Sequence, residues 1–364
     1  MLSIAGTLFV AGAIAYRARG AGWIVAAALA ASWIATMPVA VWGPAIKPDL
    51  VALALIVGAV LAVDARRAAL GGALAALALW AKPTEVFPAL ALVVFLAMRD
   101  RRGLGLGLAA GGVALVVAAL VTHVPDAAMF EHVWRWNQLD WHPDQAFLLG
   151  FLGILIAGVA FVALAVIRPR DAVGAYALGA IVVVALGGRD GATVNYLLDI
   201  LAATWFALAT SAPRIATTRA FPIALALQLL VALVLLNPLG VLPGRAISTG
   251  AWESTDNARV VHDLPGAVFP EDAGLMVVDG RPVAIDDLFL WSRLHDRLRD
   301  TLILDAVRGG AFNYVVSEVD LAHLDTGPLW EQQRWHPALV QAVLASYRFS
   351  ERRGALYVYQ RAQP

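Results

Sequence analysis

Long apolar runs separated by short charged clusters are the feature that most limits the folds open to this chain of 364 residues. Ten such segments can be marked, at residues 1–16, 21–42, 49–63, 68–81, 86–98, 104–121, 146–167, 172–187, 195–210 and 220–239. Several have fewer apolar residues than the roughly 20 that one helix needs to cross a bilayer, so flanking residues must complete them, or some are tilted or broken inside a bundle. The pattern predicts a mainly α-helical, polytopic transmembrane bundle of about ten helices.

Composition supports a membrane protein and also divides the chain in two. The mean hydropathy of +0.72 and the 60% content of hydrophobic residues lie outside the range of soluble globular chains. Residues 1–245 hold 11 of the 27 acidic residues and residues 246–364 hold the other 16. We therefore expect a transmembrane domain at 1–245 and a soluble domain at 246–364.

The basic residues predict the orientation in the membrane. Alternate connections between the apolar segments carry eleven cations in one set and five in the other, which by the positive-inside rule places the first set in the cytoplasm. This puts the chain in a bacterial plasma membrane with residues 246–364 on the extracytoplasmic side. It also places Met1 outside, and we expect from this that the chain starts one helix late. The first set is Arg17, Arg19, Arg66, Arg67, Arg99, Arg101, Arg102, Arg168, Arg170, Arg214 and Arg219, and the second is Lys47, Lys82, Arg135, Arg189 and Arg245.

The soluble region has mixed patterning. Residues 275–285 predict two strands joined by an Asp-Gly turn, 290–310 a helix that ends at glycine, "FNYVVSE" a buried strand, 336–347 a helix and 347–361 a closing hairpin. The expected fold is a small α/β domain. Its sequence shows neither a glycine-rich phosphate loop nor a metal-ligand spacing.

Two lysines stand out, because Lys47 and Lys82 are the only lysines among 27 basic residues and each precedes a proline. Asp49 and Glu85 follow them closely. Each motif alone fits a helix boundary, with proline in the first turn and an acid near the positive helix end, where Asp49 can cap the following helix. Together with Arg135 and Arg189 of other external connections, however, the lysines would place four cations at one membrane level, which suits a lipid phosphate.

Two further segments carry polar residues on the predicted external side. The connection at 122–145 holds three histidines, including His142, with four acids and three tryptophans. It fits an interfacial amphipathic helix, or a lid that binds sugar or lipid. A divalent metal is not expected, because its histidine and acid spacing lacks the repeat of recognised sites.

The other segment is "GGRDGATVNYLLDILAA" at 187–203. Asn195 and Asp199 would share a helix face beside Tyr196, with Asp199 about one turn into the membrane. Substrate binding is one interpretation, and an ion pair between Asp199 and Arg189 is the structural alternative.

In their order along the chain these elements resemble the GT-C glycosyltransferases, multi-pass enzymes that include protein O-mannosyltransferases and lipid A aminoarabinose transferases. The similarity rests on "KPDLVALALIVGAVLAVDARRAALGGALAALALWAKPTEVFPALAL", the external aromatic connection, "GATVNYLL", and "LPGAVFPEDAGLMVVDGRPVAIDDLF" and "FNYVVSE" in the tail. It implies transfer of a hexose or pentose from a polyprenyl-phosphate donor to a glycan, lipid or protein acceptor on the external face, with inversion at the anomeric carbon. No nucleic-acid partner is expected.

The resemblance also implies residue roles. Lys47, Lys82, Arg135 and Arg189 would hold the lipid phosphate, and Asp49 is the candidate catalytic acid of the site. The chain departs from the family in one respect, because the family's catalytic carboxylate lies in a first external loop and the first acid here is Asp49. A non-catalytic membrane partner or a flippase-like carrier of lipid phosphate is therefore the alternative. A secondary transporter is disfavoured, because matching broken segments in two halves are not evident.

Overall fold

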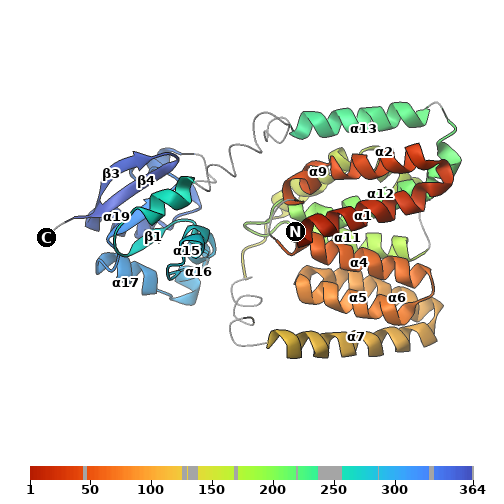
Figure 1. Cartoon of the computed structure of the whole chain (residues 1–364), viewed down its shortest axis with the longest axis horizontal. Coiled ribbons are helices and arrows are strands. Elements are labelled where there is room, and N and C mark those ends of the chain that lie inside the picture. Colours follow the sequence, from red (N-terminus) through yellow and green to blue (C-terminus); the bar gives the residue numbers. More distant parts are fainter. Residues whose placement is uncertain are drawn as a thin grey trace. The chain divides into compact units, whose positions relative to one another are not determined.

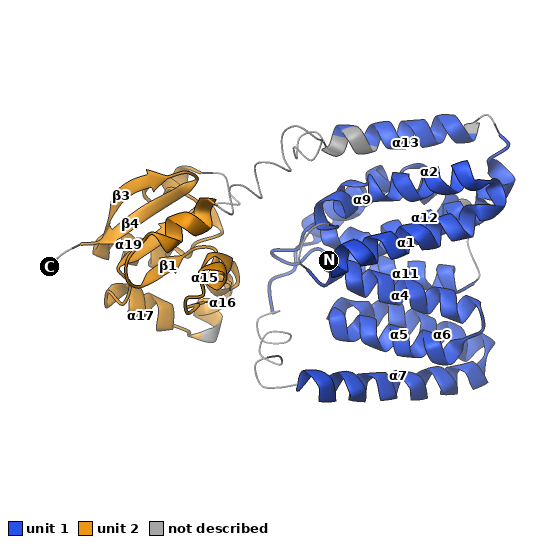
Figure 2. Cartoon of the chain, viewed as in Figure 1, with its two compact units in different colours: residues 1–242 blue, residues 243–364 orange. Residues whose placement is uncertain are grey.

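The computed structural model describes residues 1–43, 47–124, 129, 138–167, 171–218, 220–236, 256–285, 287–327 and 332–362. The chain forms two compact units, residues 1–242 and 243–364 (Figure 2). The first is helical, and the second combines helices with a small sheet (Figure 1). The chain is therefore mainly α-helical with a C-terminal α/β unit, as the sequence predicts.

The helices of the first unit follow the apolar segments of the sequence. Its elements are α1 (Leu2–Ala18), η1 (Arg19–Ala21), α2 (Trp23–Ile34), α3 (Met37–Trp42), α4 (Asp49–Asp64), α5 (Ala68–Ala81), η2 (Pro83–Glu85), α6 (Val86–Arg99), α7 (Arg101–Thr122), α9 (Pro143–Ala157), α10 (Val159–Ile167), α11 (Ala172–Leu186), η4 (Val194–Leu197), α12 (Leu198–Ile215) and α13 (Ala220–Leu236). Polar caps define two starts, since Asp100 accepts a hydrogen bond from Gly103 N at 2.8 Å and Asp171 accepts one from Val173 N at 3.1 Å.

Two of the ten segments are each broken into two helices. The segment at 21–42 breaks between α2 and α3, just before Pro38 in the first turn of α3. The segment at 146–167 bends by 101° at Gly158, between α9 and α10. Gly158 has a φ of +45°, and a Cβ there would lie 2.3 Å from Oε1 of Gln228. Gln228 of α13 accepts a hydrogen bond from Val159 N at 3.2 Å and donates one to Ile156 O, so its side chain serves the backbone groups that the break leaves free.

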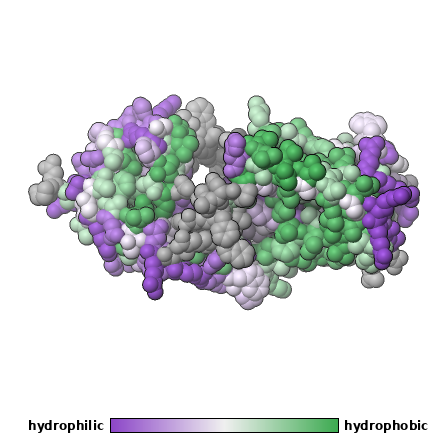
Figure 3. All heavy atoms as spheres, turned by 90° about the horizontal axis from the view of Figure 1, so that it is seen from below, coloured by the Kyte–Doolittle hydropathy of each residue, from purple (hydrophilic) through white to green (hydrophobic). Residues whose placement is uncertain are grey.

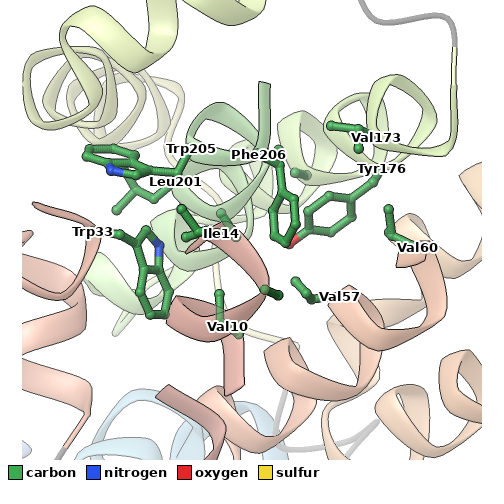
Figure 4. Packing of buried hydrophobic residues seen from close by; sticks show 14 of the residues in the cluster. Val10, Ile14, Trp33, Val57, Val60, Val173, Tyr176, Leu201, Trp205 and Phe206 are labelled. Carbon is green, nitrogen blue, oxygen red and sulfur yellow. The ribbon is translucent and has the colours of Figure 1, made fainter. Parts of the chain in front are cut away.

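The core of the helical unit lies between α1, α2, α4, α11 and α12 (Figure 4). Trp33 and Trp205 are fully buried, and Trp205 Nε1 donates to Ser32 Oγ at 2.9 Å, so the indole is packed without losing its hydrogen bond. Tyr176 of α11 lies in the same core beside Phe206 of α12. Most residues of α12 are buried, which makes it the central helix of the unit.

Glycine allows close approach between helix backbones at the periphery. A Cβ on Gly72 of α5 would lie 2.0 Å from the carbonyl oxygen of Gly107 of α7, and one on Gly179 of α11 would lie 2.5 Å from Cα of Pro88 of α6. Small residues at helix contacts are typical of bundles that pack by van der Waals contact within lipid.

Two helices in the described part of the chain are long and apolar enough to cross a membrane, α7 and the stretch Val194–Ile215, and a third if the bent pair α9 and α10 counts as one span. This is fewer than the ten spans that the apolar segments predict, because many of the helices are too short. Four shorter apolar helices lie in the described part of this unit, at Trp23–Ile34, Ala68–Ala81, Ala172–Leu186 and Phe221–Val231. Large apolar side chains are nevertheless exposed, and apolar residues cover much of the visible surface of the helical unit (Figure 3).

The second unit has the sheet order β1-β2-β4-β3. Parallel pairing joins β1 to β2, and antiparallel pairing joins β2 to β4 and β4 to β3. The elements are β1 (Val268–Pro270), α15 (Ala273–Asp279), α16 (Leu288–Leu298), α17 (Leu302–Arg308), β2 (Tyr314–Ser317), η5 (Leu321–Thr326), α19 (Pro337–Ser346), β3 (Tyr347–Arg353) and β4 (Leu356–Arg361).

The expected strand pair at 275–285 is wrong. Its first half is the helix α15, and the Asp-Gly dipeptide ends this helix because Gly280 has a φ of +70°. The expected helix at 290–310 is two helices, α16 and α17, separated at Arg299 with a φ of +52°. The predicted strand at "FNYVVSE", the helix before Tyr347 and the closing hairpin are present.

Candidate functional site

One group of polar residues at an end of the helical unit contains most of the residues that the sequence singles out. We call it the carboxylate cluster. It forms where α4 and α12 begin and where α5 ends, so residues far apart in sequence meet there. Its members are Asp49, Lys82, Glu85, Tyr176, Asn195, Tyr196 and Asp199.

Asp49 accepts contacts from two other segments. Lys82 Nζ lies 2.7 Å from Asp49 Oδ1, and Asn195 Nδ2 donates to the same oxygen at 2.9 Å. The side chains of Asp49 and Lys82 are only 6% and 11% exposed, so this ion pair is shielded from solvent. The expectation that Asp49 caps α4 is wrong, since Pro48 is the N-cap residue and no side-chain cap bond forms. The carboxylate is instead used for tertiary contacts.

Lys82 and Glu85 lie at the turn between α5 and α6. Pro83 opens the short helix η2, which ends at Glu85, as the sequence predicts. Lys82 Nζ also lies 5.6 Å from the centroid of the Tyr196 ring, within cation–π range. Glu85 is 1% exposed and interacts electrostatically with Lys82.

Asp199 lies one turn into α12 and is 1% exposed. Tyr176 of α11 donates a hydrogen bond to Asp199 Oδ1 at 2.9 Å. Asp199 also interacts electrostatically with Lys82 and Glu85. Asn195 and Asp199, which we expected on one helix face, therefore both belong to the carboxylate cluster. Tyr176 also belongs to it, although its position in an apolar helix did not indicate a polar contact.

The electrostatic character of the cluster differs from that of a cationic pocket. Three carboxyl groups, Asp49, Glu85 and Asp199, surround one ammonium group. Lys82 is therefore paired with protein acids. Burial at low dielectric strengthens the interactions between these charges and makes an unpaired charge costly. Lys82 can therefore change from one carboxylate partner to another group only if that group also carries negative charge.

The other expected cations lie elsewhere or outside the described residues. Lys47 Nζ lies 4.5 Å from the centroid of the Trp42 ring, and Lys47 O accepts a hydrogen bond from Ser3 at 2.9 Å. Arg135 falls in a stretch that the structure does not describe. Of the four cations that we expected around one point, Lys82 is therefore the one that the described residues place in the carboxylate cluster.

His142 and Arg189 belong to a second set of contacts, which joins the end of the 122–145 connection to the start of the 187–203 segment. His142 Nε2 lies 3.1 Å from Asp190 Oδ1, and Trp141 forms a β-bridge with Arg189. Gln145 Nε2 donates to Arg189 O at 2.9 Å. These contacts hold the two connections together and thereby fix the stretch that leads into Asn195.

The opposite ends of the same helices carry a contrasting contact. Arg17 at the end of α1 pairs with Asp64 at the end of α4, and Asp64 Oδ1 also accepts from Ala172 N at 3.2 Å. The connections that the charge pattern assigns to the cytoplasmic side therefore meet at this end of the helical unit. Asp49, Lys82 and Asn195, which it assigns to the external side, meet at the other end.

No family model, curated protein or solved structure matches this chain.

Proposed function

We propose that the helical unit is embedded in a bacterial plasma membrane as a bundle of about ten helical segments, with the C-terminal unit on the extracytoplasmic side. Exposed apolar surface supports this, above all on α7, where Val113, Leu120 and Val121 are each more than 60% exposed. The ion pair of Asp64 with Arg17 and that of Asp49 with Lys82 lie at opposite ends of α4, which agrees with the alternating charge pattern. The short helix η2 adjoins α5 and α6 and adds its three residues to the turn between them.

Within this membrane protein, we propose a glycosyltransferase of the GT-C type that moves a hexose or pentose from a polyprenyl-phosphate donor to a glycan, lipid or protein acceptor. The observation that carries the proposal is the buried pairing of Lys82 with Asp49 at the proposed external end. A carboxylate and an ammonium at the membrane surface are the two groups that such a transfer uses, as base and as phosphate partner.

The chemistry assigns one role to each group. Asp49 takes the proton of the acceptor hydroxyl, and that oxygen forms a bond to the anomeric carbon as the bond from this carbon to the phosphate oxygen breaks. The polyprenyl phosphate leaves with the electron pair, and Lys82 neutralises its charge. Donor binding therefore exchanges the partner of Lys82 from Asp49 to phosphate, which frees Asp49 to act as a base.

An apolar groove supports a lipid ligand. It has a volume of about 790 Å³ and lies along α6 and α11, lined by residues that include Phe87, Leu90, Val94, Leu178 and Val182. Phe87 follows Glu85 by two residues, so the groove begins near the carboxylate cluster. A prenyl chain in the groove would carry its phosphate towards Lys82.

The test is transfer of label from a panel of hexosyl and pentosyl polyprenyl phosphates by the purified chain in liposomes. We expect Asp49→Asn to abolish transfer and the charge-balanced double variant of Lys82→Met with Asp49→Asn also to weaken donor binding, whereas Arg19→Gln at the opposite end keeps both. The enzymatic proposal fails if no donor of the panel is turned over or if Asp49→Asn transfers at the wild-type rate.

One observation favours the alternative, a non-catalytic membrane partner or carrier of lipid phosphate. Asp49 is 5% exposed and already has two protein partners, which is the state of a structural carboxylate. Binding of polyprenyl phosphate that persists in Asp49→Asn, without transfer from any donor, identifies this alternative.

A further inference from the structure

Three potential metal ligands meet in the C-terminal unit, well away in sequence from the carboxylate cluster. His295 and Asp296 are neighbours in α16, and His336 is the N-cap residue of α19. His295 Nε2 lies 3.1 Å from Asp296 Oδ1, and His336 Nε2 lies 3.4 Å from Asp296 Oδ2. One ligand atom from each of the three residues can be chosen so that all lie within 4.8 Å of one another. We call these residues the histidine cluster.

The indole ring of Trp291 packs beside both histidine rings. The fully buried Trp291 ring lies 4.6 Å from the His295 ring and 6.4 Å from the His336 ring, centroid to centroid. Ser292 of the same helix accepts a hydrogen bond from His336 N at 3.0 Å, which anchors the start of α19 to α16. The two helices therefore fix the ligand atoms before any ion arrives.

Exposure differs sharply across the cluster. The His295 side chain is 7% exposed and that of His336 is 20% exposed, whereas Asp296 is 82% exposed. The site is thus closed on the histidine side and open on the carboxylate side, so water can complete the coordination of an ion there.

We propose that the histidine cluster binds a divalent transition metal of the zinc class. Two imidazole nitrogens and one carboxylate oxygen are ligands that zinc prefers, and metal–ligand bonds of about 2.1 Å in a tetrahedron place ligand atoms about 3.4 Å apart. The imidazole nitrogens of His295 and His336 lie 3.1 and 3.4 Å from the two different oxygens of Asp296, so a small rotation of this exposed carboxylate presents one oxygen to an ion between the rings. A water molecule fills the fourth position.

Metal binding has a cost that is specific to this site. His336 Nδ1 accepts a hydrogen bond from Ala338 N at 3.2 Å, so in the metal-free neutral ring the proton lies on Nε2. A metal on Nε2 moves that proton to Nδ1, and Ala338 N loses its cap. The ion and the first turn of α19 therefore compete for one imidazole, and the affinity is lower than that of a site whose second nitrogen donates to an acceptor.

The histidine cluster has no signature in the sequence, because its three residues do not follow a metal-ligand spacing. His295 and Asp296 have no spaced partner nearby, and His336 joins them only through the packing of α19 on α16. The site belongs to the C-terminal unit, so it does not depend on the proposed glycosyl transfer.

The experiment measures ZnCl₂ binding by calorimetry, and the absorption of CoCl₂ as a substitute, on the full chain in detergent without a histidine tag. We expect one Zn²⁺ per chain and a loss of affinity of more than about tenfold in His295→Gln, Asp296→Asn and His336→Asn. His336→Asn is informative because asparagine keeps an N-cap acceptor for Ala338 N. Asp296→Asn, at an exposed position, does not disturb the core.

The matched control is His262→Gln, which removes a histidine that contacts one carboxylate, Asp279 at 2.6 Å. We expect this variant to bind as the wild type does. A wild-type chain that binds no Zn²⁺, or cluster variants that bind with wild-type affinity, would overturn the proposal.

Discussion

Lys82 and Asp49 form a buried ion pair across 2.7 Å that joins the end of α5 to the start of α4. Neither side chain has enough contact with water to replace its partner. The pair therefore makes the two helix ends depend on each other, and it sets the geometry of the whole carboxylate cluster.

Replacement of Lys82 by methionine should destabilise the helical unit strongly, because it leaves buried carboxylates without their cation. Breaking one partner of such a pair typically costs about 3–5 kcal/mol. The double variant Lys82→Met with Asp49→Asn should recover part of this loss. Thermal unfolding of the chain in detergent measures both, and Lys47→Met, at an exposed lysine, is the control. Equal unfolding midpoints for the single and the double variant would contradict this account.

Replacement of Tyr176 by phenylalanine should also destabilise the unit, by removing the hydrogen bond to Asp199 while keeping the ring in the core. A buried acceptor left without its donor costs about 1–3 kcal/mol. Tyr16→Phe, at a residue 60% exposed, should leave the unfolding midpoint unchanged. The role assigned to Tyr176 is wrong if both variants unfold at the same temperature.

Substitution of Gly72 by alanine should force α5 and α7 apart, since the new Cβ would meet the backbone of Gly107. Overpacking of this kind costs about 1–3 kcal/mol. Gly112→Ala on α7 is a close control, because a Cβ there meets nothing within 4 Å. It should be neutral or slightly stabilising, since alanine favours a helix over glycine. Unfolding midpoints of the two variants decide between a packing contact and a general effect of glycine replacement.

Acidification should loosen the contact between η5 and β4 in the C-terminal unit. Burial tends to raise the pKa of Asp320, but hydrogen bonds from His323, Ala322 N and Tyr359 outweigh it, so the pKa is lowered. A lowered folded-state pKa gives stabilisation that is fully present above the usual carboxyl range and is lost as the pH falls below about 4. The protection factors of the amides in 321–326 and 356–361, which correct hydrogen exchange for its intrinsic pH dependence, should fall there in the wild type.

Asp320→Asn keeps a cap for Ala322 but removes the charge, so its protection factors should depend less on pH over the same interval. Asp325→Asn, a nearby substitution at another aspartate of η5, should retain the wild-type profile. A wild-type profile in Asp320→Asn would show that this carboxylate is not the titrating group.

The apolar runs located the helices because a helix that packs among other helices needs a largely apolar sequence. They did not show where a run breaks, since the bend at Gly158 depends on Gln228 of a distant helix. The Asp-Gly at 279–280 was misread for a related reason. The same dipeptide can turn a hairpin or end a helix, and only the packing of Leu275 and Met276 in the core of the C-terminal unit selects the helix.

Three residues of the candidate site could be predicted, because each is a polar residue of an unusual kind or in an unusual place within an apolar sequence. The rarity of lysine drew attention to Lys82, and the polar start of α12 drew attention to Asn195 and Asp199. Their pairing was not predictable, because the charge of Lys82 suggested an open phosphate site, whereas the fold surrounds it with acids. Tyr176 and the histidine cluster depend on contacts between helices, which leave no local pattern in sequence.

The side chain that serves the bend between α9 and α10 comes from residue 228, which the ribosome adds long after residue 158. During synthesis, Val159 N and Ile156 O therefore have no partner in Gln228 until this residue has been added. The final hydrogen bonding of the bend between α9 and α10 thus depends on a side chain of α13, and these two backbone groups gain their partner only when α13 packs beside them.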